Sequence, residues 1–196
     1  MGKNIVKVLF GIFIFVSVSN VWADDSSIKV EGIIFNSTVK VAGKTLVLNG
    51  AGKRVKLFHD VYAMGLYVPK KSTSPDDLIQ MDGPKLIEIH MLRNVDAKTF
   101  VEALKDGLED NNADDTLSKL KPQITQLESI MLQTKQASKG NTIKLEFNPS
   151  GGTQVYMNGK KLGSQIGAGA NFYSALLRVW LGKDSVDGDL KISLEG

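Results

Sequence analysis

Two periodicities of apolar residues alternate along the chain. In the first, every second side chain is apolar, which is typical of half-buried strands. This pattern fills much of residues 28–68, returns at 85–92 and comes back after residue 141. The dipeptide Asn158-Gly159, between two such segments, is a strong signal for a tight hairpin. We expect strands at Ile28–Phe35, Val39–Val41, Thr45–Leu48, Lys85–Leu92, Thr142–Phe147, Thr153–Met157 and Lys160–Leu162, with two more between Leu48 and Val68.

In the second periodicity, apolar residues lie three and four positions apart, which predicts helices. Ser74 followed by Pro75 is a typical helix start. Pro122 lies inside one of these patterns and should kink or split that helix. The expected helices are Pro75–Met81, one from Asp96 that ends between Gly107 and Asn112, one from about Asp114 to Met131, and Ala170–Leu181, whereas the tail after Gly182 has no clear pattern.

The order of these elements is strands, a cluster of helices, further strands and a final helix. It predicts an α+β fold, in which helices lie on one face of a mostly antiparallel sheet. The alternating order of a Rossmann fold is absent. Residues 24–196 are enough for a single domain with its own core.

The first 23 residues have the pattern of a cleaved secretory signal peptide. Lys3 and Lys7 form a basic start, the apolar run Val8–Val18 follows, and Val21-Trp22-Ala23 suits cleavage after Ala23. The run is too short for a membrane span, which needs about 20 residues. No cysteine follows it that could carry a lipid anchor. We therefore expect a secreted or periplasmic protein.

Charge and composition exclude several classes of function. The chain has 24 Lys and Arg against 21 Asp and Glu, or 22 against 21 without Lys3 and Lys7, which is no footprint for nucleic acid or acidic membranes. With no cysteine there are no disulfides, thiolate metal sites or cysteine nucleophiles. His59 and His90 lack metal-ligand spacing, and Gly43-Lys44-Thr45 lacks the first glycine of a phosphate-binding loop. We predict neither a metal nor a cofactor.

The segment Leu48–Val68 carries Arg54 and two tyrosines among apolar residues. Within it Gly50-Ala51-Gly52 lacks the third glycine of a dinucleotide-binding motif, so a tight turn is the better interpretation. An arginine that points toward an apolar interior needs an anion, which could be a ligand. The alternatives are an exposed arginine, or one that pairs with a carboxylate such as Asp60 or Asp96.

Several motifs follow one another over about residues 30–185. They are Leu48-Asn49-Gly50-Ala51-Gly52-x-Arg54, Val61-Tyr62-x-x-Gly65-Leu66-Tyr67-Val68, Gly140-Asn141-x-Ile143, Gly152-Thr153-x-Val155-x-x-Asn158-Gly159, and Phe172-x-x-Ala175-Leu176 before Val179-Trp180-Leu181-Gly182. In this order the chain resembles the chalcone isomerase-like family, in particular its exported bacterial branch. The resemblance implies an open-faced β-sandwich, a large antiparallel sheet with helices over one face and a cleft between them.

The resemblance also assigns positions to the residues of the plant enzymes, which close a chalcone to a flavanone. The family's arginine corresponds to Arg54 and the enzymes' threonine to Tyr62. Their catalytic tyrosine and asparagine correspond to Phe100 and Gly107, and the Ser/Thr of the last helix corresponds to Val179. Each lost donor costs about 3 kcal/mol of transition-state stabilisation. We therefore assign no catalytic residue and expect no chalcone isomerase activity.

A second branch of the family binds fatty acids, with an arginine and a tyrosine that hold the carboxylate. Arg54 and Tyr62 match this pair, so the resemblance implies a non-catalytic binding protein for a fatty acid or another small amphipathic carboxylate. Arginine can grip a carboxylate with two hydrogen bonds, and ten buried methylenes contribute about 8 kcal/mol before ordering costs. We expect a monomer that does not span the membrane. The tail would lie among Met64, Leu66, Phe100, Leu104 and Phe172.

Strand parity opposes this pair. If His59-Asp60 is a two-residue turn, Arg54 shares a face with Tyr67, and Tyr62 points away; a bulge or a longer loop reverses this. We predict Tyr62 and keep Tyr67 as the alternative. Two other functions also stay open, an isomerase or lyase with Arg54 as electrophile, and a cell-envelope interaction module with an inert cleft.

Overall fold

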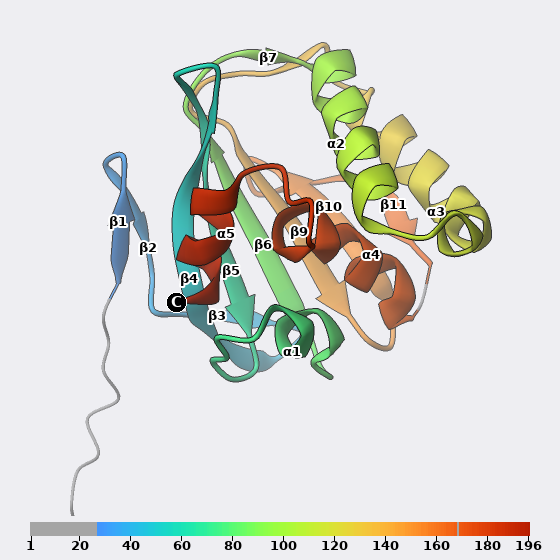
Figure 1. Cartoon of the computed structure of the whole chain (residues 1–196), viewed down its shortest axis with the longest axis horizontal. Helices are drawn as coiled ribbons and strands as arrows, with labels where there is room; N and C mark the ends of the chain where they lie inside the picture. The colour runs from blue at the N-terminus through green and yellow to red at the C-terminus, as the bar shows by residue number, and fades with distance from the viewer. Residues whose placement is uncertain (1–26, 168) are drawn as a thin grey trace, which may run out of the picture.

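The computed structural model describes residues 27–167 and 169–196, so the predicted signal peptide lies outside it. Its centre is a curled antiparallel sheet of seven strands in the order β11-β10-β9-β6-β5-β4-β3 (Figure 1). The predicted α+β class is confirmed. The strands are β3 Thr38–Val41, β4 Lys44–Lys56, β5 His59–Val68, β6 Lys85–Met91, β9 Thr142–Asn148, β10 Gly152–Met157 and β11 Lys160–Ile166.

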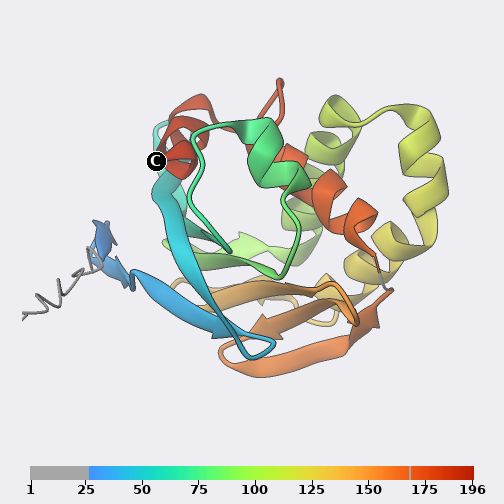
Figure 2. The same ribbon diagram turned by 90° about the horizontal axis from the view of Figure 1, so that it is seen from below.

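The helices cover one face of this sheet (Figure 2). The larger hydrophobic core lies between them and the sheet. In the described part of the chain, no helix is both long and apolar enough to cross a membrane. The helices are α1 Pro75–Gln80, α2 Ala97–Asn111, α3 Asp114–Met131, α4 Ala170–Leu181 and α5 Gly188–Glu195, and the short strands β7 Val95–Asp96 and β8 Gln136–Ala137 pair beside α2.

Side-chain caps explain the starts of α1 and α2. The side chain of Ser74 accepts a hydrogen bond from the backbone N–H of Asp77, and Asp96 accepts two at the start of α2. Pro122 does not split α3, contrary to one expectation. Leu120 and Leu127 lie on either side of it and are both buried in the same core, so packing holds the helix together across the missing hydrogen bond.

The prediction of a single strand over Ile28–Phe35 is wrong. This segment is a hairpin of β1 Ile28–Val30 and β2 Ile33–Phe35. Its turn residues Glu31 and Gly32 have φ of 49° and 83°, which fits a tight hairpin turn. A smaller core lies on the sheet face opposite the helices. There Phe35 packs on Gly65, where a Cβ atom would stand 2.6 Å from its ring.

The C-terminal helix α5, which the sequence pattern did not predict, lies across β4. Gly50 and Gly52 are inside this strand, so the expected tight turn is wrong. A Cβ atom on Gly52 would stand 2.6 Å from the Cβ of Ser193, and one on Gly50 would overlap the backbone of α5. The two glycines therefore let the helix approach the strand. Asn49 secures it by donating a hydrogen bond of 2.6 Å to the carbonyl oxygen of Leu194.

Candidate functional site

Arg54 and Tyr62 lie directly opposite each other on β4 and β5. The turn of this hairpin is Leu57-Phe58, and His59-Asp60 already belongs to β5. A bulge shifts the register by one residue next to Arg54, which reverses the parity expected for a simple two-residue turn. Both side chains therefore lie on the same face of the sheet, and the guanidinium carbon is 5.8 Å from the centre of the tyrosine ring.

Tyr67, the alternative partner, lies on the opposite face of the sheet. It pairs with Leu48 and belongs to the smaller core together with Phe35 and Ala63. Burial raises the pKa of its phenol. Tyr67 therefore cannot share a ligand with Arg54.

Arg54 is half-buried, and its Nε atom is buried without a hydrogen-bond partner in the described part of the chain. No carboxylate among the described residues lies within 4.0 Å of its guanidinium. Asp60 instead pairs with Lys53 at 3.0 Å, and Asp96 caps α2. The alternative of a structural ion pair with either aspartate is therefore wrong. A buried donor without a partner is unfavourable, and an anionic ligand would satisfy it.

Tyr62 is buried beneath the helices, and its hydroxyl oxygen accepts a hydrogen bond of 2.8 Å from Nε1 of Trp180 on α4. Burial raises the pKa of Tyr62, although the charge of Arg54 and the bond from Trp180 oppose the shift. The phenol therefore stays protonated, and its O–H group can donate a hydrogen bond to an oxyanion. Sequence reasoning placed Trp180 only on an apolar helix face. The indole N–H, which needs an acceptor when buried, was the available signal.

Two cavities meet at Phe100, a half-buried residue of α2. The outer cavity, of about 310 Å³, is lined by basic groups, including Arg54. The inner cavity, of about 30 Å³, is almost entirely apolar and lies between the sheet and the helices. Phe100 borders both, and its ring centre is 6.3 Å from that of Tyr62. The arrangement is amphipathic, with positive charge at the mouth and apolar side chains inside.

The inner cavity is not lined by all the residues expected around a tail. Of the five, Phe100 and Leu104 line it. Met64, Leu66 and Phe172 are buried in the packed core and do not line it, because the cavity lies further toward β6, β9 and β10. It is bordered instead by Ile89, Ala97, Leu127, Met131, Thr134, Ala137, Ile143, Leu145, Val155, Tyr156, Met157, Leu162 and Trp180.

Gly107 and Val179 lie apart from this mouth. A Cβ atom on Gly107 would stand 2.8 Å from a methyl group of Val179, so the two residues form a close contact between α2 and α4. Neither lines the inner or the outer cavity. Of the three positions that the resemblance links to catalysis, only Phe100 lies beside Tyr62, and its ring carries no hydroxyl.

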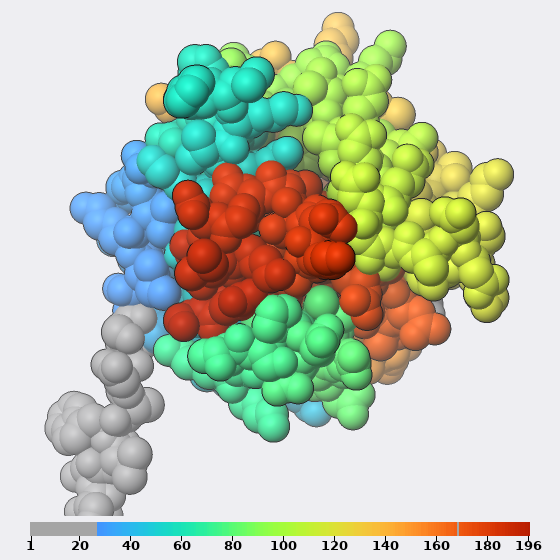
Figure 3. All heavy atoms as spheres, viewed as in Figure 1, coloured from blue at the N-terminus to red at the C-terminus, as the bar shows by residue number. Residues whose placement is uncertain are grey.

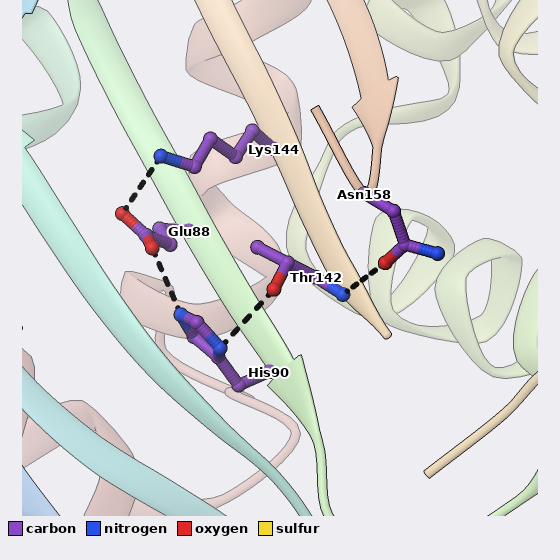
Figure 4. A network of polar contacts seen from close by, with 5 residues as sticks. All are labelled: Glu88, His90, Thr142, Lys144 and Asn158. Carbon is purple, nitrogen blue, oxygen red and sulfur yellow. Dashed lines mark hydrogen bonds and ion pairs between the residues drawn. The ribbon is translucent and has the colours of Figure 1, made fainter. Parts of the chain in front are cut away.

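A polar network lies on the sheet face opposite the helices (Figure 4). Nε2 of His90 is 2.8 Å from Glu88, Nζ of Lys144 is 3.3 Å from the same carboxylate, and the hydroxyl of Thr142 is 3.3 Å from Nδ1 of His90. Although burial opposes it, His90 and Lys144 lower the pKa of Glu88. The two histidines lie apart, since His90 belongs to this network, whereas His59 lines the outer cavity. The described residues contain no cluster suited to hold a metal ion.

Comparisons with known proteins agree with this fold. The fatty-acid binding protein AtFAP1 of Arabidopsis thaliana matches with a TM-score of 0.65 and 19% sequence identity, over 87% of this chain and 96% of that protein. At this identity the likeness shows the fold alone. A search of curated proteins found no match. The chalcone isomerase-like family matches over residues 27–196, and the chain therefore belongs to that family.

Proposed function

We propose that the chain is a non-catalytic binding protein for a fatty acid or another small amphipathic carboxylate. The observation that carries the proposal is the buried, unpartnered Nε of Arg54 on the face that it shares with Tyr62. A carboxylate in the outer cavity would accept hydrogen bonds from the guanidinium. Tyr62 lines neither cavity, and its phenol would become a second donor when the neighbouring ring of Phe100 moves aside. The fatty-acid binding protein of the same fold supports this class of ligand.

The two cavities suit the two ends of such a ligand. The outer cavity, at about 310 Å³, matches the lower end of ordinary ligand sites and holds the charged head group. The inner one is too small for an acyl chain in this conformation. A tail would enter when the side chain of Phe100, on the border, turns aside. Binding is therefore coupled to the position of Phe100.

The absence of catalysis belongs to the same proposal. Three side chains contact Tyr62, of which Phe100 carries no donor, whereas Arg54 and Trp180 do. The donor of Trp180 is already used by the phenol oxygen. The site can therefore hold an anion, but it offers few groups to move a proton. Export of the chain, with cleavage after Ala23, is also part of the proposal.

Calorimetric titration with dodecanoate, and with dodecanol as the matched neutral ligand, tests the proposal. We expect dodecanoate to bind at least tenfold more tightly, because a hydrogen bond to a charged group contributes about 1.5–3 kcal/mol. Arg54→Met should remove this preference. Arg54→Lys should restore only part of it, because lysine cannot form the bidentate pair. Equal binding of acid and alcohol, or unchanged binding by Arg54→Met, would refute the proposal.

A second candidate function has one observation in its favour. Because the inner cavity is only about 30 Å³, the cleft could be inert and the chain an interaction module of the cell envelope. Native mass spectrometry of protein isolated from its own compartment separates the two. Co-purified acyl chains support the binding protein, and a ligand-free cleft that also rejects dodecanoate supports the module.

A further inference from the structure

The tip of the β4–β5 hairpin exposes a cluster of apolar side chains. Phe58 is fully exposed, and Leu57 and Val55 are 78% and 40% exposed. Six large apolar side chains of the described chain are this exposed, and the other three, Ile34, Leu132 and Ile192, lie on separate elements. The tip stands at the edge of the molecule beside β7 (Figures 1 and 3). Half of the exposed large apolar residues therefore gather in one projecting loop.

The backbone of this tip is unfavourable for the residues it carries. Leu57 and Phe58 have φ of 49° and 66°, so both turn residues are left-handed. Asn-Gly is the preferred pair for such a turn, and bulky apolar residues are rare there. The turn of β10–β11 has the same geometry and does carry Asn158-Gly159. The Leu-Phe pair therefore makes the turn less stable and the surface less soluble than Asn-Gly would. This cost indicates that the pair serves binding rather than folding.

Basic side chains lie beside the tip. The outer cavity is lined by Arg54, Lys56, His59 and Arg93, with Asp96 as its acidic group. Asp96 already accepts hydrogen bonds at the start of α2, and no carboxylate of the described residues pairs with these three basic side chains, Arg54, Lys56 and Arg93.

Nearby carboxylates reduce this excess, but none of those that the structure describes pairs with the three basic side chains. Lys53 pairs with two carboxylates, Glu31 at 2.7 Å and Asp60 at 3.0 Å, and these partners raise its pKa. The carboxylate of Asp187 accepts hydrogen bonds from the N–H groups of Val55 and Leu190. The lining of the outer cavity, next to the apolar tip, therefore carries three basic side chains that are unpaired among the described residues, Arg54, Lys56 and Arg93, against the one carboxylate of Asp96.

We propose that this hairpin docks the protein on an anionic phospholipid bilayer. Leu57 and Phe58 enter the interfacial layer, and Lys56 and Arg93 lie against the head groups. An apolar tip flanked by these unpaired basic side chains has the chemistry that such a surface binds. Leu57 and His59 also line the outer cavity, so docking turns its mouth toward the bilayer. The docking does not depend on which ligand the cleft holds.

Vesicle sedimentation tests the proposal with protein recovered from cells that express the full sequence. The vesicles are phosphatidylcholine with about one third phosphatidylglycerol, and phosphatidylcholine alone. The double variant Leu57→Asn/Phe58→Gly should lower partition onto the anionic vesicles at least about tenfold, because two apolar side chains leave the interface. Its turn pair suits the left-handed backbone, so its unfolding temperature should not fall.

Two further variants sharpen the result. Lys56→Gln/Arg93→Gln should lower partition onto anionic vesicles roughly 30-fold, since each basic side chain near such a surface contributes about fivefold. Ile192→Gln is the matched control, because Ile192 is 69% exposed on α5, and its partition should equal that of the unaltered protein. Equal partition of the unaltered protein and the Leu57→Asn/Phe58→Gly variant, or no partition of the unaltered protein onto anionic vesicles, overturns the proposal.

Discussion

Replacing Arg54 by methionine should make the unliganded protein more stable while it abolishes carboxylate binding. Methionine has a similar length and carries no donor, so it removes the buried Nε that lacks a partner. An unsatisfied buried donor costs about 1–3 kcal/mol. The substitution also removes the contact with the ring of Tyr62, which is worth about 0.5–2 kcal/mol. The cost that is removed exceeds the contact that is lost, so the free energy of unfolding should rise by on the order of 1 kcal/mol.

Thermal unfolding of the unliganded protein measures this gain. For a domain of this size, 1 kcal/mol corresponds to a shift in Tm of about 2–4 °C. In the unaltered protein, a ligand present at about 100 times its Kd adds roughly 2.7 kcal/mol of stability, and Arg54→Met should lose that increment. Lys56→Met is the control, since Lys56 borders the same outer cavity but is exposed, and its Tm should be unchanged.

The prediction is refuted if the unliganded Arg54→Met variant unfolds at a lower temperature than the unaltered protein, or if the two temperatures are equal. A lower temperature would mean that Arg54 stabilises the fold and needs no ligand. The prediction also fails if the variant keeps the full increment from dodecanoate, because the anchor of the carboxylate would then lie elsewhere.

Four other predictions follow from the same contacts. Phe100→Ala should join the two cavities and speed the association of dodecanoate roughly tenfold in stopped-flow measurements, whereas an unchanged rate would show that Phe100 is no barrier. Gly50→Ala should lower the free energy of unfolding by about 2–3 kcal/mol in urea titration, since its Cβ would overlap the backbone of α5; full stability would contradict the packing described. The fold lowers the pKa of Glu88 below its ordinary value of 4.5, so the ionised carboxylate adds stability at pH values above 4.5, and this stability is lost as the pH falls through the lowered pKa. Glu88→Gln should therefore be less stable than the unaltered protein at neutral pH and lose less stability in acid, as thermal unfolding followed by circular dichroism can measure. Incubation with a chalcone should give no flavanone by absorbance, and turnover that depends on Arg54 would overturn the non-catalytic assignment.

Much of the fold follows from local signals that the sequence carries openly. Ser74 precedes its helix as expected, and Asp96, the predicted start of the next helix, is its N-cap. The helix α4 has the predicted bounds, and Asn158-Gly159 forms the predicted hairpin. In each of these cases the signal acts within a few residues. Local hydrogen bonding and backbone preference are then enough to define the element.

The face of Arg54 could not be predicted in this way. It depends on a turn at Leu57-Phe58, two residue types that rarely take left-handed φ, and on a bulge that the composition does not mark. Either feature alone changes which side chains share a face. The roles of Gly50 and Gly52 were equally hidden. Both glycines are needed because a helix more than 130 residues further along the chain packs against them, and no local sequence pattern indicates such a contact.

The strand that carries Arg54 is enclosed by the two ends of the described chain. Glu31, beside β1, pairs with Lys53, and α5 lies across Gly50 and Gly52. The bond from Asn49 to Leu194 joins residues 145 positions apart. During synthesis β4 therefore emerges long before α5, the helix that completes its cover. Until then the nascent chain is incompletely folded around β4, and this delay would favour the proposed export before folding is complete.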